Sequence, residues 1–235
     1  MEVPFAAPAR ALFLTLVRPL LRPGEAFVGA PPPLGRALLR MLAVWVPLAL
    51  ANAALTVWRA LQAYGELRRS GPPDWLERLP GADPEVLWEV FRTLPAPPAF
   101  GRIWPWLLLV VPVSVLGTWF HHAVWDHTGL WLLGGLKERR GFRTSLGAEA
   151  EALRLAALGT LIGLLGFLPV LGVVLAVPLL LLDGYLWLFR GFALAARHGC
   201  EPWRGVGATV VHAVLLGACG LGLVAMMLVL LGTAP

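Results

Sequence analysis

The sequence predicts an all-α polytopic integral membrane protein, a helical bundle of five transmembrane helices. Of its 235 residues, 58% are hydrophobic and 14% are charged, whereas an ordinary soluble domain has about 25% charged residues. The mean hydropathy is +0.73. A soluble chain of this length needs more charged side chains to cover its core. The apolar residues also fall in runs long enough to cross a bilayer, so lipid is expected to replace the missing polar surface.

The first segment of the chain is expected to lie on the membrane surface in the cytoplasm. Apolar side chains recur on one side of residues 10–21, Leu20 among them, with arginines at the edge, which is typical of a helix lying flat in the headgroup region. Pro19 interrupts that stretch, so we do not expect it to cross. We therefore predict an amphipathic surface segment over residues 1–35 and a five-span membrane domain over residues 36–235.

The first predicted span covers residues 38–58, a stretch without an acid that matches a hydrocarbon layer of about 30 Å. Residues 60–102 follow as a long polar connection in which basic and acidic side chains balance. Within it, Asp83 followed by Pro84 is typical of a helix start, and the apolar residues that come next fall on one helical face. We therefore predict an outer loop that carries a short amphipathic helix.

The later apolar runs supply four more spans. The second begins at the headgroup-type aromatic residue Trp104 and covers residues 104–128. The stretch from residue 155 to residue 189 would measure about 52 Å as one helix, too long for a single crossing. Pro169 and Gly172 mark the expected turn. The last three spans are predicted at residues 152–168, 172–190 and 206–231.

Basic residues indicate the orientation, because lysine and arginine gather on the cytoplasmic side of bacterial membrane proteins. Under a five-span path, thirteen of the nineteen lysines and arginines fall on one side and six on the other. The N-terminus is therefore expected inside and the C-terminus outside. The bias toward Ala, Leu, Gly, Pro and Arg is typical of a GC-rich bacterial genome, so we expect a multi-pass protein of the cytoplasmic (inner) membrane.

Three stretches near the ends of these spans carry a resemblance to a known family. They read LVRPLLRPGEAF from Leu16, HTGLWLLGGLKERRGFRTSLGAEAEALRLAA from His127, and FLPVLG from Phe167 with a following arm that ends DGYLWLFRGFALAARHG. In these stretches the chain resembles the Yip-domain family, named for proteins that interact with Ypt and Rab GTPases. The resemblance implies five spans and a cytoplasmic N-terminus.

In eukaryotic members the same resemblance implies a role in vesicle traffic with small GTPases. The chain departs from those members, because it lacks their long acidic or aromatic-rich N-terminal domain and their DLYGP-type motif. This departure puts a small GTPase partner in doubt, and the bacterial branch of the family supplies no role that can be carried over.

Four ionisable residues form a candidate intramembrane polar site: His122, Asp126, His127 and Asp183. Such groups are costly at membrane depth and usually face the bundle interior. His122 and Asp126 share a helical face and could bind a metal, relay protons or neutralise each other. A zinc site would need a further ligand, so we favour the structural pair. For Asp183 we expect a bond to a span-two histidine or to Tyr185, with transport or partner binding as the alternative.

A basic linker and two glycines supply the candidate contacts with lipid and protein. The linker after span two has four basic side chains, at Lys137, Arg139, Arg140 and Arg143. Because such charges lie beside apolar runs and not in one exposed stripe, we expect anionic lipid headgroups or a membrane-protein partner to contact them, and no nucleic acid. Gly159 and Gly163 offer a small face for helix packing, within the chain or in a homodimer.

The sequence contains no phosphate loop, nucleophile elbow, paired catalytic carboxylates or cysteine cluster. We therefore expect no enzyme activity, no cofactor and no metal. The predicted function is that of a Yip-family-like scaffold for membrane organisation or partner recruitment. The alternative is a small transporter, or a transporter subunit, that uses intramembrane aspartate and histidine residues.

Overall fold

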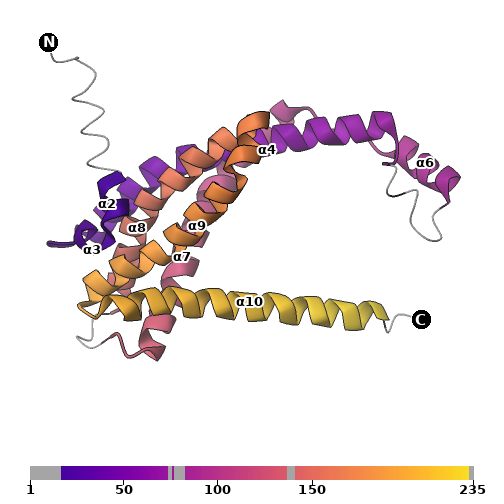
Figure 1. Cartoon of the computed structure of the whole chain (residues 1–235). Helices are drawn as coiled ribbons and strands as arrows, with labels where there is room; N and C mark the ends of the chain where they lie inside the picture. The colour runs from indigo at the N-terminus through magenta and orange to yellow at the C-terminus, as the bar shows by residue number, and fades with distance from the viewer. Residues whose placement is uncertain (1–16, 74–75, 77–82, 137–140, 233–235) are drawn as a thin grey trace, which may run out of the picture. The chain divides into compact units, whose positions relative to one another are not determined.

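The computed structural model describes residues 17–73, 76, 83–136 and 141–232, and these residues contain helices and no strand (Figure 1). The predicted all-α class is confirmed, and five helices are long and apolar enough to cross a membrane. They are α4 (Leu34–Ser70), α7 (Phe100–Leu132), α8 (Phe142–Gly163), α9 (Pro169–His198) and α10 (Pro202–Gly232). The chain therefore has the helices of a multi-pass membrane protein.

The five helices lie over the five predicted spans but are longer. The helix α4 continues to Ser70, so residues 60–70, expected at the start of the outer loop, are helical. The helix α8 begins at Phe142, ten residues before the predicted start of its span. Hydropathy detects only the part of a helix that lipid can cover. Polar residues with good helix propensity prolong a helix beyond that part without changing the hydropathy signal.

The chain divides into two compact units, one with residues Met1–Val46 and Ser114–Pro235 and the other with Pro47–Val113. The division falls inside α4 and α7, at Pro47 and next to Pro112. Proline lacks an N–H group and its ring crowds the preceding turn, so it weakens a helix at that point. The two prolines therefore give a physical reason for the position of the boundary.

The second unit contains the short helix α6 (Pro84–Thr93), in the segment where a short amphipathic helix was expected. The side chain of Asp83 caps it by accepting a hydrogen bond from the Glu85 N–H at 2.9 Å. At its other end, Arg68 of α4 donates to the Leu94 carbonyl at 2.8 Å. The helical extension of α4 thus holds the end of α6.

In the first unit, α8 and α9 form the hairpin predicted around Pro169. The helix α8 ends at Gly163, the 3-10 turn η2 (Leu164–Phe167) follows, and Pro169 occupies the first turn of α9. A Cβ atom on Gly172 would lie 2.5 Å from the carbonyl oxygen of Gly166. The turn is therefore tight enough to require a residue without a side chain at position 172.

The helix α9 packs against both α8 and α10. Arg197 near the end of α9 pairs with Glu151 in the middle of α8, and Leu186 of α9 packs at Gly159 further along α8. Because the partner numbers rise on α8 as they fall on α9, the two helices are antiparallel. The prediction that the apolar stretch folds back on itself is therefore confirmed for the described residues.

Glycines let the backbones of α7, α9 and α10 approach closely. A Cβ atom on Gly191 of α9 would lie 2.5 Å from the backbone nitrogen of Val206 in α10. A Cβ atom on Gly129 of α7 would lie 2.7 Å from the carbonyl oxygen of Ala208. Small residues at such positions are typical of helix packing in lipid, where van der Waals contact between helices replaces the hydrophobic effect.

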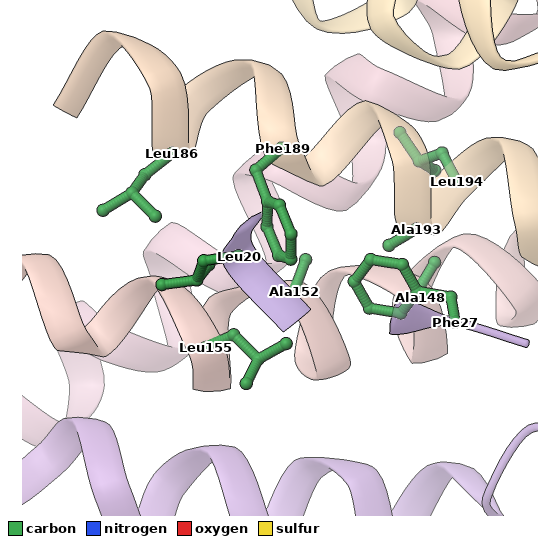
Figure 2. Packing of buried hydrophobic residues seen from close by; sticks show 9 residues of the cluster. All are labelled: Leu20, Phe27, Ala148, Ala152, Leu155, Leu186, Phe189, Ala193 and Leu194. Atoms are coloured by element: carbon green, nitrogen blue, oxygen red, sulfur yellow. The ribbon is translucent and has the colours of Figure 1, made fainter. Parts of the chain in front are cut away.

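The apolar core of the first unit lies between α8, α9 and the N-terminal segment with the short helices α2 (Arg18–Leu21) and α3 (Pro23–Ala26) (Figure 2). Phe27 packs on Phe189 with ring centroids 5.3 Å apart. Tyr185 donates a hydrogen bond to the Leu20 carbonyl. Leu20, which the sequence suggests should face the membrane surface, is instead buried against the hairpin. The described part of the N-terminal segment is thus tied to the helix pair.

Candidate functional site

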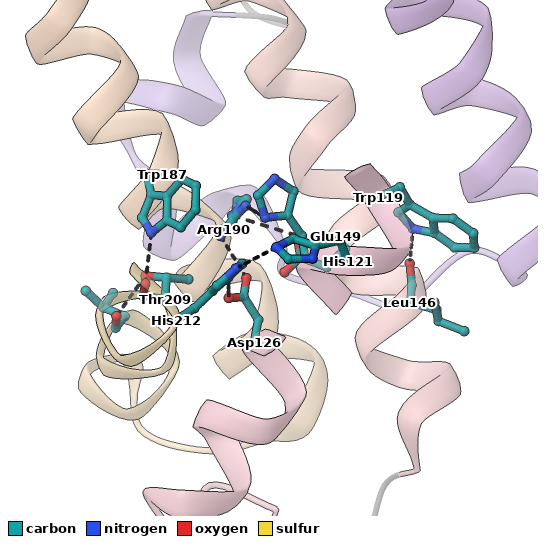
Figure 3. A network of polar contacts seen from close by, with 11 residues as sticks. Trp119, His121, Asp126, Leu146, Glu149, Trp187, Arg190, Thr209 and His212 are labelled. Atoms are coloured by element: carbon teal, nitrogen blue, oxygen red, sulfur yellow. Dashed lines mark hydrogen bonds and ion pairs between the residues drawn. The ribbon is translucent and has the colours of Figure 1, made fainter. Parts of the chain in front are cut away.

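A buried cluster of ionisable side chains joins α7, α8, α9 and α10 in the first unit (Figure 3). At its centre, Nη2 of Arg190 in α9 lies 3.0 Å from Oδ2 of Asp126 in α7, and the two side chains are 3% and 0% exposed. Nε of Arg190 lies 3.8 Å from Oε2 of Glu149 in α8, which is also inaccessible. One guanidinium group therefore neutralises charge from two other helices.

The second oxygen of Asp126 bonds to α10. Nδ1 of His212 lies 2.6 Å from Oδ1 of Asp126. A carboxylate only accepts hydrogen bonds, so the imidazole donates from Nδ1. The other ring nitrogen of His212 lies 3.3 Å from Nε2 of His121. The imidazole of His212 is thereby fixed in orientation between a carboxylate and a second imidazole.

His122 completes the contacts of Arg190. Nη1 of Arg190 donates to Nδ1 of His122. Arginine has no acceptor, so Nδ1 carries no proton and the ring is neutral with its hydrogen on Nε2. The guanidinium carbon also lies 4.2 Å from the ring centroid of Trp187, a cation-π distance. The indole nitrogen of Trp187 donates to the Thr209 carbonyl at 2.8 Å, which holds the ring against α10.

The charges of the cluster are close to balance. Arg190 contributes one positive charge, whereas Asp126 and Glu149 contribute two negative charges when both are ionised. An uncompensated charge in a low-dielectric interior is costly. The cluster is neutral only when it holds one further proton, either on Glu149 or on an imidazole such as His212.

A second polar layer contains Ser145, His127 and His198. The hydroxyl oxygen of Ser145 in α8 lies 2.8 Å from Nδ1 of His127 in α7 and 2.8 Å from Nε2 of His198 at the end of α9. A hydroxyl group donates one hydrogen bond and accepts others, so it can bond both imidazoles at once. Ser145 and His198 are buried and His127 is partly buried. The layer therefore adds a second polar connection between α7, α8 and α9.

The structure brings His122 and Asp126 together through Arg190, not through a bond to each other. His127 belongs to the second layer with Ser145. Among the described residues, no group of three or more His, Cys, Asp or Glu side chains is arranged to hold a metal ion. The two layers therefore form a network of polar side chains that bond one another.

Asp183 lies apart from this network. Its side chain is exposed on α9, and it makes no hydrogen bond or ion pair with the described residues. The hydroxyl of Tyr185, expected as one partner, is used by the Leu20 carbonyl instead. Asp183 precedes Arg190 by seven residues, about 10 Å of helix.

The remaining candidate residues have separate surroundings. Arg143 is exposed at the start of α8, whereas residues 137–140, with Lys137, Arg139 and Arg140, lie outside the described part of the chain. A Cβ atom on Gly159 would lie 2.5 Å from Cδ1 of Leu186, so this glycine packs within the α8–α9 hairpin. A Cβ atom on Gly163 would have no described atom within 4 Å.

Sequence reasoning missed several members of the network. His212 is the only charged or imidazole side chain between residues 206 and 231, a signal that could have found it. Arg190 was predicted as the last residue of the span 172–190, whereas α9 continues to His198 and Arg190 is buried. Glu149 gave no comparable signal, because it precedes the apolar part of α8.

The fold and hydropathy define the class of protein, a multi-pass α-helical membrane protein. Comparison of the chain with protein-family models, with curated proteins and with solved structures gives no match. The Yip-domain resemblance therefore stays a prediction from the three sequence stretches.

Proposed function

We propose that the chain is a non-enzymatic scaffold of the Yip type in a bacterial inner membrane, with its N-terminus in the cytoplasm and its C-terminus outside. It organises anionic lipids or recruits membrane-protein partners at its basic end. The observation that supports this most is the pairing of the buried Asp126 with two partners from other helices. Asp126 uses one oxygen for Arg190 and the other for His212, and all three side chains are buried.

Pairing of this kind favours a scaffold because transport requires groups that exchange partners with a substrate. A buried ion pair is costly to separate, so it favours one arrangement of the helices that carry it. The helix ends beside the cluster are fixed too, since Arg204 in α10 donates to the carbonyls of Leu133 and Gly134 after α7 at 2.8 and 2.6 Å. Arg143 is exposed on α8, the helix that also carries Glu149 of the cluster. This basic side chain therefore lies on a helix that the cluster ties to α9.

The scaffold proposal is tested by removal of the positive charges of the linker. Replacement of Arg139, Arg140 and Arg143 by glutamine is expected to reduce the anionic lipid and the partner proteins that co-purify with the chain from its native membrane. The matched control replaces three exposed arginines of the second unit, Arg69, Arg92 and Arg102, by glutamine. Equal recovery of lipid and partners from the linker variant and the control would contradict the proposal.

A small transporter is the second candidate, and two observations favour it. Asp126, His212 and His121 form a continuous series of proton-bearing groups, and Asp183 is exposed on an apolar helix. A transporter predicts flux of protons or solute in reconstituted vesicles that is lost on Asp183→Asn or Asp126→Asn. The scaffold predicts flux no faster than in empty vesicles, and flux dependent on either aspartate would favour the transporter.

A further inference from the structure

A second polar feature of the first unit is separate from the buried cluster and from the linker arginines. A pocket of about 400 Å³ lies between the start of α4 with the residues before it, the middle of α8 and the C-terminal end of α9. Its wall includes three consecutive prolines, Pro31–Pro33, whose rings fix the backbone. Its size is in the range of small-molecule sites, about 300–1,000 Å³.

The pocket holds an excess of positive charge. Four arginines line it with one carboxylate, that of Glu151; they are Arg36, Arg40, Arg154 and Arg197. Arg197 donates two hydrogen bonds to the Glu151 carboxylate, from Nε to Oε1 at 3.0 Å and from Nη2 to Oε2 at 2.5 Å. The remaining three arginines have no carboxylate within 4 Å in the described part of the chain.

Two of these three arginines come from different helices and line the same pocket. Arg40 of α4 and Arg154 of α8 lie close enough for their positive charges to repel one another. Arg154 is half-buried, so water screens that repulsion less than at an open surface. An anion seated between the two guanidinium groups would relieve it and accept their hydrogen bonds.

The level of the pocket along the helices indicates where the anion comes from. Arg40 is the last charged residue of α4 before the charge-free residues 41–58, and Arg154 is the last before the charge-free residues 155–182. Both helices therefore pass from polar to apolar sequence at the same arginine layer. Headgroup phosphates of a bilayer lie at such a boundary.

We propose that Arg36, Arg40 and Arg154 form a binding site for a phosphate group, supplied by the headgroup of an anionic phospholipid. The guanidinium fork matches phosphate oxygens and donates two parallel hydrogen bonds to them. The rigid proline wall and the Arg197–Glu151 ion pair hold the site open beside the bilayer. A soluble phosphate compound has the same chemistry and is the other source. The inference goes beyond the proposed function, which depends on the linker arginines.

The test measures thermal stability and lipid retention of the full chain in nanodiscs. The discs contain phosphatidylcholine alone or phosphatidylcholine with phosphatidic acid. Phosphatidic acid is expected to raise the unfolding temperature and to stay bound in native mass spectrometry, because a ligand that binds only the folded state stabilises it. Each arginine contributes a charge-assisted hydrogen bond. The double variant Arg40→Gln, Arg154→Gln should therefore weaken the retention of phosphatidic acid about tenfold or more.

The control Arg22→Gln removes one exposed positive charge outside the pocket. It should leave retention unchanged. The variant Arg154→Lys keeps the positive charge and tests the site even if the double variant does not fold. It should retain lipid to an intermediate degree, because lysine lacks the planar guanidinium fork. Equal loss of retention in Arg22→Gln and in the double variant would overturn the proposal, as would the same retention in the double variant and the parent chain.

A separate arm adds inorganic pyrophosphate to the protein in phosphatidylcholine discs. Stabilisation by pyrophosphate that the double variant loses, without retention of phosphatidic acid, would support the phosphate site and assign it to a soluble compound. No stabilisation by either ligand would overturn it. A negative result here would not affect the outcome of the linker experiment, so failure of the phosphate site and failure of the scaffold proposal can be distinguished.

Discussion

The replacement Asp126→Asn tests the central ion pair of the buried cluster. Asparagine keeps the shape of the side chain but removes its charge. Its amide keeps one accepting oxygen, so whichever of Arg190 and His212 faces the NH₂ group loses its acceptor. In the parent chain these partners lie 3.0 and 2.6 Å from the two carboxylate oxygens. The replacement leaves Arg190 buried with only the more distant Glu149, at 3.8 Å, to balance it.

The expected cost follows from the burial. Removal of one partner of a buried ion pair typically costs about 3–5 kcal/mol, because the other charge stays buried and uncompensated. For a chain of this size, each kcal/mol shifts the unfolding temperature by about 2–4 °C. We therefore expect Asp126→Asn to lower the unfolding temperature by about 6–20 °C. The assay is thermal unfolding in one detergent at one scan rate, followed by circular dichroism.

Asp183→Asn is the matched control, since it makes the same chemical change in another apolar helix. Asp183 is exposed and bonds no described residue. A neutral amide costs less than a carboxylate in an apolar environment, so this variant should unfold at the parent temperature or above it. Equal unfolding temperatures for the two variants would refute the reasoning that Asp126 stabilises the packing of α7 with α9 and α10.

Three further predictions concern single contacts, and thermal unfolding checks the first two. Ser145→Ala removes the hydroxyl to which two imidazoles bond and should cost about 1–3 kcal/mol, whereas the exposed Ser114→Ala should cost nothing measurable; the same result for both would contradict the second layer. Gly191→Ala places a Cβ atom 2.5 Å from the backbone of α10 and should destabilise by about 1–3 kcal/mol, whereas Gly217→Ala, with open space around it, should not; an unchanged Gly191 variant would refute the close approach. Asp83→Ala should speed amide hydrogen exchange in the first turn of α6, because a lost N-cap costs about 1 kcal/mol, and Asp83→Asn should preserve protection; equal exchange in both variants would contradict the cap.

The sequence predicts the number and approximate place of the long helices, because hydropathy reports directly on the solvent around each segment. The hairpin at Pro169 follows from length alone, since the apolar stretch is too long for one crossing. The cap at Asp83 follows from local hydrogen bonding. In each case the signal lies within a few turns of the residues concerned.

The network around Arg190 could not be predicted in the same way. Asp126 and His212 are 86 residues apart, and nothing in either helix states which neighbour it packs against. Arg190 looks like a headgroup residue because it ends an apolar run, and only the pairing of α9 with α7 shows that it is buried. Partner choice depends on helix packing, which periodicity does not encode.

Reporter fusions to the two ends of the chain test the five-crossing account most directly. A reporter that is active only outside the inner membrane should be inactive at the N-terminus and active at the C-terminus, and a reporter that matures only in the cytoplasm should give the reverse result. Both ends reported in the same compartment would mean an even number of crossings. That result would contradict the topology and the basic cytoplasmic face on which the proposed scaffold depends.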